Sequence, residues 1–414
     1  MIGQRNRFVL CALPAAISLT LSAHASADLF SDSKASLELR NMYMNRDFRQ
    51  EGGAPTQEDW GQGFTLRVQS GFTEGQIGFG LDTMAQLGVK LDSTAGNSGT
   101  GVLAVNETGV PADDWSELGL TGKVKFRQTT LRAGTLQPVL PVVMYNDTRL
   151  LSATFTGAMV TSDKDIPGLQ LNAGRLTEVN QRNSSSRDDI AYYTGIESDN
   201  FVFGGGQYEI NPSTSASYYY GALDDVYKQH FLGFVNTLPL SERLSIKTDL
   251  RYFKSLDNGK ALAGKIDNDA LMGMLTLSVG AHKFSGAYQQ ISGDGNLPFL
   301  SGADPYSVNL VTYNTFNKAE TDAWQLRYDY DFAGLGIPGL AFMSRYVSGY
   351  DIDTPTVKNG REWERDTDLV YVVQSGALKG FNVRLRNVSF RSTSGLTSDI
   401  DENRIILGYT LALW

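Results

Sequence analysis

Several cations of this sequence stand inside stretches where polar and apolar residues alternate. Arg67 lies between Leu66 and Val68. In a strand, such a cation points away from the face that carries its apolar neighbours. The cations in this setting are Arg40, Arg67, Lys125, Arg132, Arg384 and Arg386. Because arginine stays charged and can hold a carboxylate through two hydrogen bonds, their shared face could attract an anionic solute.

The rival interpretation is that these cations pair with nearby acids and only stiffen the structure. The acids available for such pairing are Glu38, Asp249, Asp329 and Asp331. A separate triplet, Lys123, Lys125 and Arg127, could equally form a charged patch at a rim. The sequence leaves both interpretations open.

A second candidate group lies in residues 134–162, an apolar stretch that contains two prolines. A long apolar loop in a structured protein is usually functional. Its centre carries Tyr145, Asn146, Asp147 and Arg149. Mixed charge at a narrow point of a pore sets up a transverse field, and rings of charge select ions. We expect this loop to fold inward and narrow a pore. Its central residues could contact the solute, or Asp147 could instead pair with Arg149 and merely fix the loop.

An enzyme is the competing class of protein, and the sequence offers little chemistry for it. None of the histidines, His24, His230 and His282, stands in a nucleophile or HExxH motif. Scattered histidines and the single cysteine, Cys11, do not form a metal-binding pattern. We therefore expect no enzyme, cofactor or metal; a serine-type hydrolase or a structural barrel is the remote alternative.

The first residues have the pattern of an export signal. Arg5 and Arg7 precede the apolar residues 8–21, and Ala25-Ser26-Ala27 is a small-residue cleavage site. We predict a signal peptide over residues 1–27 and a mature chain over 28–414. The signal carries the only cysteine, so the mature protein can form no internal disulfide.

The chain is acidic, with a formal net charge of −9 that becomes more negative once the two arginines of the signal are lost. This charge argues against a nucleic-acid partner, whose phosphates attract basic surfaces. No apolar run of about 18 residues follows the signal, so no membrane helix is expected. Hydropathy alone would indicate a soluble secreted protein.

The alternating pattern points instead to a membrane barrel. Residues 244–253 and 324–332 place apolar side chains on one face and charged ones on the other. A membrane barrel has low mean hydropathy because only every second residue meets lipid. A soluble core for so long a chain would be unusual, since single cores stop growing near about 250–300 residues. We predict an all-β fold, a transmembrane antiparallel β-barrel.

Connections and strand ends support this prediction. Long polar loops, as at 92–114, alternate with tight turns, as at 72–75; outer-membrane barrels have long extracellular loops and short periplasmic turns. With about 9–11 residues per span and an even strand number, the chain suffices for about 18 strands. We expect Tyr192-Tyr193 and Tyr218 to Tyr220 at the lipid interface.

The C-terminal strand, residues 404–414, ends in an aromatic, as the assembly signal of outer-membrane proteins does. Tyr409, Leu411 and Leu413 share a parity that Trp414 does not. Strict alternation cannot turn all four toward lipid. We therefore expect either a small irregularity or a position of Trp414 at the rim.

The sequence resembles the OprD-type substrate-specific porins of pseudomonads, also called outer-membrane carboxylate channels. The stretches that carry this resemblance are Leu39-Arg40-Asn41 with Asn45-Arg46-Asp47, Gly75 to Asp82, Asn146 to Leu151, Trp324 to Tyr346 and Asp401 to Arg404. They occur in order over nearly the whole mature chain.

The resemblance implies a monomeric barrel of 18 strands whose third and seventh loops form the constriction. The third loop would be Thr135 to Ser162. The seventh would lie within Ile291 to Ala319 and add Asp304 and Tyr306 to the constriction. A cationic row along the wall would lead an anionic group through, drawing on Arg40, Arg67, Lys123, Lys125, Arg132, Arg384, Arg386 and Arg404.

We therefore expect a substrate-specific channel for small carboxylates in the outer membrane of a Gram-negative bacterium, with cyclic or aromatic carboxylates favoured. A channel for basic amino acids and small peptides, or a nonspecific porin, is the alternative. The expected partners are small anionic or zwitterionic solutes, outer-membrane lipid and lipopolysaccharide, and the barrel assembly machinery. The chain is expected to be a monomer or weak oligomer.

Overall fold

The structure is a computed structural model that describes residues 29–50 and 55–414. Within these residues, eighteen long strands form one antiparallel barrel. The barrel closes because β1 (Lys34–Phe48) pairs with both β2 (Gln57–Gln69) and β22 (Ile400–Ala412). The predicted fold class and strand number are confirmed. The predicted signal peptide, residues 1–27, lies outside the described residues.

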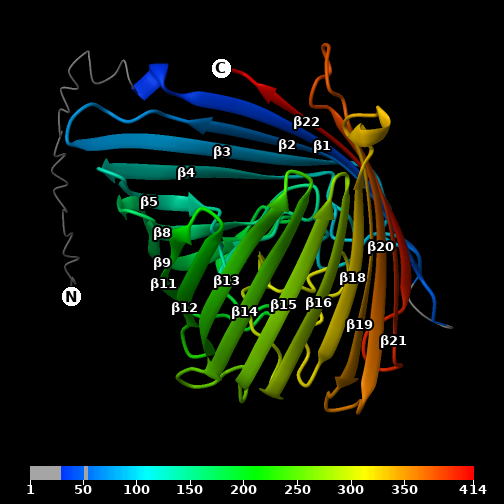
Figure 1. Ribbon diagram of the computed structural model, residues 1–414. Helices are drawn as coiled ribbons and strands as arrows, with labels where there is room; N and C mark the ends of the chain where they lie inside the picture. The colour runs from blue at the N-terminus through cyan, green and yellow to red at the C-terminus, as the bar shows by residue number, and fades with distance from the viewer. Residues whose placement is uncertain (1–28, 51–54) are drawn as a thin grey trace, which may run out of the picture.

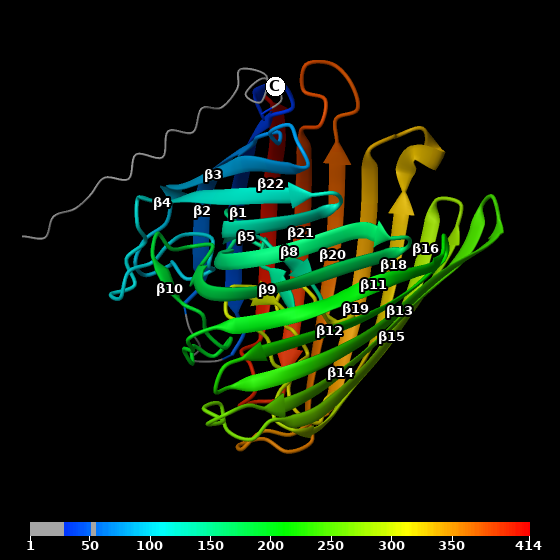
Figure 2. The same ribbon diagram turned by 90° about the vertical axis from the view of Figure 1, so that its left-hand side faces the viewer.

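Each barrel strand pairs with its neighbours in sequence (Figure 1). The strands between β2 and β22 are β3 (Ile77–Asp92), β4 (Asp114–Phe126), β5 (Thr129–Leu136), β8 (Thr154–Ile166), β9 (Leu169–Asn180), β11 (Phe201–Asn211), β12 (Thr214–Leu223), β13 (Tyr227–Ser241), β14 (Leu244–Asp257), β15 (Asp267–Val279), β16 (His282–Asp294), β18 (Asp322–Asp331), β19 (Leu340–Ile352), β20 (Gly360–Val372) and β21 (Asn382–Ser392). Figure 2 shows that β11 to β14 run obliquely across the wall, as closure of a barrel requires.

The two ends of the barrel differ in their connections. Two residues join β8 to β9, whereas residues 295–321 join β16 to β18 at the opposite end. The C-terminus lies at the end of the tight turns, together with the short helix η1 (Phe332–Leu335) (Figure 1). The tight turns are therefore the periplasmic end, and the long loops are extracellular.

The strands turn apolar side chains outward. On β15, Leu271 and Leu275 are 59% and 57% exposed, whereas Ala270 and Met272 point inward and are buried. An outward apolar band is what a barrel presents to lipid. Among the described residues, no helix is long and apolar enough to cross a membrane.

Loops fill much of the lumen near the extracellular end. We name four of them: the second loop (residues 93–113), the third (137–153), the fourth (181–200) and the seventh (295–321). Leu150 and Leu151 of the third loop pack on Met42 and Met44 of β1. A larger cluster joins Val142 and Val143 of the third loop, Ile190 and Tyr192 of the fourth, and Leu297 and Leu300 of the seventh to the inner wall.

Several expected boundaries and positions are corrected by the structure. β8 begins at Thr154, so residues 154–162 are strand; the third loop is shorter than predicted because an alternating pattern resumes directly after it. β16 extends to Asp294, which shifts the start of the seventh loop. Tyr192 and Tyr219 are buried under the loops and do not face lipid.

The last residue takes one of the two expected positions. β22 ends at Ala412, and Trp414 lies beyond it at the rim. Its indole nitrogen donates to the Ser33 hydroxyl over 2.9 Å. Tyr409, Leu411 and Leu413 keep the common parity, so the strand itself needs no irregularity.

Candidate functional site: a lumen constriction and its charged wall

The third and seventh loops meet inside the barrel. β6 (Val139–Leu140) and β7 (Val143–Tyr145) of the third loop form a small sheet with β17 (Ala303–Asp304) of the seventh. Tyr145 lies opposite Ala303, and the backbone N–H of Asn146 donates to the Gly302 carbonyl over 2.9 Å. The two loops therefore hold each other in place across the lumen.

Asp147 reaches from the third loop to the barrel wall. The Arg40 guanidinium on β1 donates to both Asp147 oxygens over 2.7 and 3.2 Å, and to the Arg149 carbonyl over 2.7 Å. Glu38 accepts a further bond from Arg40 over 2.6 Å. Asp147 is thus paired with the wall, and the alternative pairing with Arg149 is not formed.

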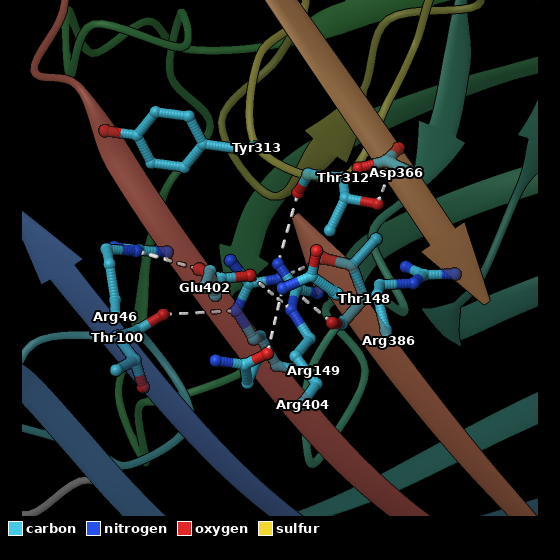
Figure 3. A network of polar contacts seen from close by, with 12 residues as sticks. Arg46, Thr100, Thr148, Arg149, Thr312, Tyr313, Asp366, Arg386, Glu402 and Arg404 are labelled. Carbon is cyan, nitrogen blue, oxygen red and sulfur yellow. Dashed lines mark hydrogen bonds and ion pairs between the residues drawn. The ribbon is translucent and has the colours of Figure 1, made fainter. Parts of the chain in front are cut away.

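Arg149 is buried, and no carboxylate of the described residues forms an ion pair with it. Its guanidinium donates to the carbonyls of Thr100 and Thr148 over 3.1 and 3.0 Å. Burial, and then the nearby cations Arg404 and Arg182, lower the pKa of this side chain. Arg149 therefore ties the third loop to the second and is closed off from solute (Figure 3).

Asn146 links three loops at the constriction. Its amide nitrogen donates to Asp304 over 2.6 Å, and its amide oxygen accepts from Arg182 of the fourth loop over 2.6 Å. Burial raises the pKa of the Asp304 carboxyl to about 6, although Arg182 and Arg149 act in the opposite direction. Arg182 was missed by sequence reasoning because it stands in no alternating pattern.

Tyr306 of the seventh loop packs on the far wall. The Arg251 guanidinium of β14 lies 3.9 Å from the centre of its ring and donates to its carbonyl over 3.3 Å. Phe231 meets the ring edge-on at 5.7 Å. Arg251 also donates two hydrogen bonds to the Asp249 carboxylate, so its guanidinium is fixed both by the wall and by the seventh loop.

A buried cluster of ion-paired side chains on β1 and β22 binds the seventh loop. Glu402 accepts from Arg46 over 2.8 Å and from Arg404 over 2.6 Å (Figure 3). Arg404 is 2% exposed and also donates to the Thr312 carbonyl over 3.2 Å. The Arg404 guanidinium therefore bonds to protein groups and is not exposed to the lumen.

Four inward carboxylates follow one another on β20. Glu364 is fully buried and accepts backbone N–H bonds from Thr312, Tyr313 and Asn314 over 3.0, 2.8 and 2.8 Å. The other three are Glu362, which pairs with Lys318, Asp366, which pairs with Arg345, and Asp368, which pairs with Arg386. An acid at every second position from residue 362 to 368 is a sequence signal that could have revealed this set.

The predicted cations differ in whether they are paired with a carboxylate of the wall. Arg386 donates twice to Asp368 at 2.6 Å, and Lys123 is buried against Asp82 at 2.6 Å. Arg67 shares Glu38 with Arg40. For part of the row, these pairs agree with the rival interpretation, in which the cations pair with nearby acids.

Three cations of the row keep free donors. Arg384 is 42% exposed in its side chain and lies 3.9 Å from Asp368. In the part of the chain that the structure describes, Arg132 and Lys125 have no carboxylate partner; Lys125 lies 5.5 Å from the ring centre of Phe72.

Register brings most of the row together. Arg386 lies opposite Arg404, and Arg40 opposite Gly408 next along the wall. Arg40, Arg384 and Arg386 line one recess of about 360 Å³ below the third loop. Arg67 and Arg132 line another of about 300 Å³. Arg327 and Arg345, which sequence reasoning missed, line a third with Arg384.

The last candidates to consider are metal-ligating groups and the histidines. Among the described residues, no group of three or more His, Cys, Asp or Glu side chains is arranged to hold a metal ion. The His230 and His282 rings lie 2.9 Å from the hydroxyls of Tyr218 and Tyr328 on neighbouring strands.

Comparison with known proteins gives consistent matches over the full barrel. Residues 27–413 match the family model described as outer membrane porin, OprD family. The Porin-like protein GalP of Pseudomonas putida is 36% identical over 403 residues, 96% of this chain and 97% of the relative. The crystal structure of Pseudomonas aeruginosa OccK9 (OpdG) is 40% identical with a TM-score of 0.90, covering 93% of this chain and 100% of that one. The crystal structure of Pseudomonas aeruginosa OpdK with vanillate is 36% identical with a TM-score of 0.88, and it also covers 93% of this chain and 100% of that one.

Proposed function

This chain belongs to the OprD family of outer-membrane porins, and we propose that it carries small carboxylate-bearing solutes along the cations of its lumen. The family and fold are those of channels in the Gram-negative outer membrane and not of enzymes. The observation that carries the proposal is the unequal use of charge on the lumen wall.

Several acids of the wall are paired with arginines, whereas some of the cations that the structure describes are not paired with acids. Glu38, Asp329 and Asp368 each accept from at least one arginine. Arg384 retains donors that face the recess below the constriction. A carboxylate that has passed the third loop would therefore meet an available guanidinium, and then that of Arg132 farther along the wall.

Cyclic or aromatic carboxylates are the solutes we favour. OpdK was crystallised with vanillate, an aromatic carboxylate, and shares 36% identity with this chain. At the constriction of this chain, Tyr145 and Tyr306 are half-buried and present ring surface beside the charged groups. A channel for basic amino acids would need unpaired acids in the same places.

The test is the Arg384→Gln variant, compared by single-channel recording and liposome uptake of benzoate-type solutes. Losing one partly exposed charge-assisted bond should weaken carboxylate block and uptake roughly fivefold. Arg365→Gln, which removes an outward-facing arginine from the adjacent strand, is the matched control and should leave both unchanged. Equal uptake by Arg384→Gln and the original protein would remove this residue from the transport route, and a large conductance insensitive to carboxylates would favour a nonspecific porin.

The processing and assembly of the chain are further parts of the proposal. We propose that residues 1–27 are removed on export, that the barrel assembly machinery inserts the mature chain, and that it acts as a monomer or weak oligomer. N-terminal sequencing of protein from outer membranes tests the cleavage; a mature chain that does not begin at Asp28 would contradict the predicted site.

A further inference from the structure

An aromatic belt marks the outer face of the barrel near its extracellular end. Trp324, Tyr346 and Trp363 lie on three adjoining strands, with ring centres 5.6 and 5.5 Å apart. Trp363 is the fourth residue of β20, which starts at the loop end of the barrel. Outward aromatic rings lie where the headgroups of a bilayer begin. The belt thus places this part of the wall in the outer leaflet.

Arginines surround Trp363 on the same outward face. Arg361 and Arg365 are its alternate neighbours on β20 and are exposed, while Glu362 and Glu364 between them point into the lumen. On β21, Arg391 lies opposite Trp363 in register, with its guanidinium 5.8 Å from a ring centre. Three guanidinium groups therefore gather around one indole at the lipid interface.

Two of these arginines have no acidic partner among the residues that the structure describes. Arg391 is bound to Asp401 by two bonds of 3.0 and 3.1 Å. Arg365 donates to the neutral Asn387 and Ser389, over 2.9 and 3.3 Å. Within residues 29–50 and 55–414, no ion pair involves Arg361 or Arg365. The bonds to Asn387 and Ser389 fix the direction of the Arg365 side chain and leave its other donors free.

The depth of these charges makes a lipid partner favourable. Leu369 and Tyr371 continue the outward face of β20 toward the membrane and are 40% and 41% exposed. A cation close to such an apolar band is destabilising unless an anion compensates it. A phosphate monoester offers several acceptor oxygens to the forked donors of arginine, and each basic side chain near an anionic surface contributes about fivefold in affinity.

We propose that Arg361 and Arg365, with Trp363 between them, bind the phosphorylated headgroup of an outer-leaflet glycolipid. The guanidinium groups hold the phosphate, and the indole packs against the sugar or the upper part of the acyl chains. The site lies on the outer wall, so it is separate from the lumen and independent of the transported solute.

Native mass spectrometry of the detergent-folded barrel with lipid A carrying two phosphates tests this proposal. The original protein should retain the lipid, and Arg361→Gln/Arg365→Gln should bind it about thirtyfold more weakly. Lys228→Gln is the matched control, since Lys228 is an outward cation at the extracellular end of β13, away from the belt. Arg361→Lys/Arg365→Lys keeps the charge and should lose much less affinity.

The lipid probes separate the possible sources of binding. Dephosphorylated lipid A should bind the original protein as weakly as intact lipid A binds the Gln double variant. Phosphatidylglycerol and inorganic phosphate should both bind more weakly than intact lipid A. The proposal is overturned if the Gln double variant retains intact lipid A as well as the original protein does. It is also overturned if dephosphorylated lipid A, phosphatidylglycerol or inorganic phosphate binds the original protein as tightly as intact lipid A.

Discussion

At the scale of single residues, Asp304 is the constriction group whose charge can change near neutral pH. Burial raises the pKa of this carboxyl from its ordinary value of 3.8 to about 6. The groups facing it are Asn146, Arg182, Arg149 and Asp147. Its ionisation therefore alters the balance of charge where the third and seventh loops meet inside the barrel.

We expect the channel to become more anion-selective as the pH falls from about 7.5 to 5, because Asp304 then loses its negative charge. Reversal potentials in a salt gradient measure this change. Asp304→Asn removes the titrating group and should show anion selectivity that hardly varies over this range. A variant whose selectivity shifts as much as that of the original protein would assign the titration to another group.

The same group gives a stability prediction of defined sign. Between about pH 3.8 and 6 the folded barrel binds a proton at Asp304 that the unfolded chain does not. Its contribution to stability therefore increases as the pH falls from 7 through 6 toward 4. Denaturant titrations in detergent should show this increase in the original protein and a smaller one in Asp304→Asn.

At the scale of elements, the loops are held by contacts that differ in kind. The backbone of the seventh loop is bound to acidic side chains of the wall, as at Glu364. The third loop packs closely against glycines of β2: a Cβ at Gly63 would lie 2.8 Å from the Leu150 carbonyl. The positions of both loops thus depend on buried residues.

Glu364→Gln should loosen the seventh loop. The amide keeps the volume of the carboxyl group but replaces one acceptor oxygen with a donor nitrogen, so one or more of the three N–H groups at residues 312–314 is less well bound. We expect a loss of about 1–3 kcal/mol in unfolding free energy together with more open-channel current noise. Glu58→Gln, on the outward face of β2, is the control and should change neither measurement.

Gly63→Val should push the third loop away from β2 and into the lumen. Overpacking of this kind costs about 1–3 kcal/mol, and the displaced loop should lower single-channel conductance. Gly286→Val is the matched control, because a Cβ at Gly286 meets nothing within 4 Å. If the two variants conduct alike, the packing of Leu150 on β2 does not set the aperture.

At the scale of the whole molecule, the barrel depends on the lipid that surrounds its outward face. Leu275 stands near the middle of β15 and is 57% exposed. Leu275→Arg should destabilise the barrel in bilayers by about 2–4 kcal/mol. Leu335→Arg, in the periplasmic turn, should cost far less. Urea titrations in lipid vesicles compare the two, and equal losses would contradict the membrane position of β15.

The sequence by itself determined the barrel, its strand number and the inward direction of the wall cations. These follow from alternation, which depends only on neighbouring residues: Arg67 between Leu66 and Val68 must point to the lumen if the two neighbours point to lipid. The predicted end of the third loop was wrong because no glycine or proline stands next to Thr154, where the strand resumes.

Only the tertiary structure decided which charges remain available. Arg384 and Arg404 look alike in sequence, yet one keeps free donors and the other is buried against Glu402 and Thr312. Asp147 meets Arg40, 107 residues away, and not the nearby Arg149. The physical reason is that the partner of a charge depends on the loops folded over it, and loop positions follow from packing across the lumen rather than from local pattern.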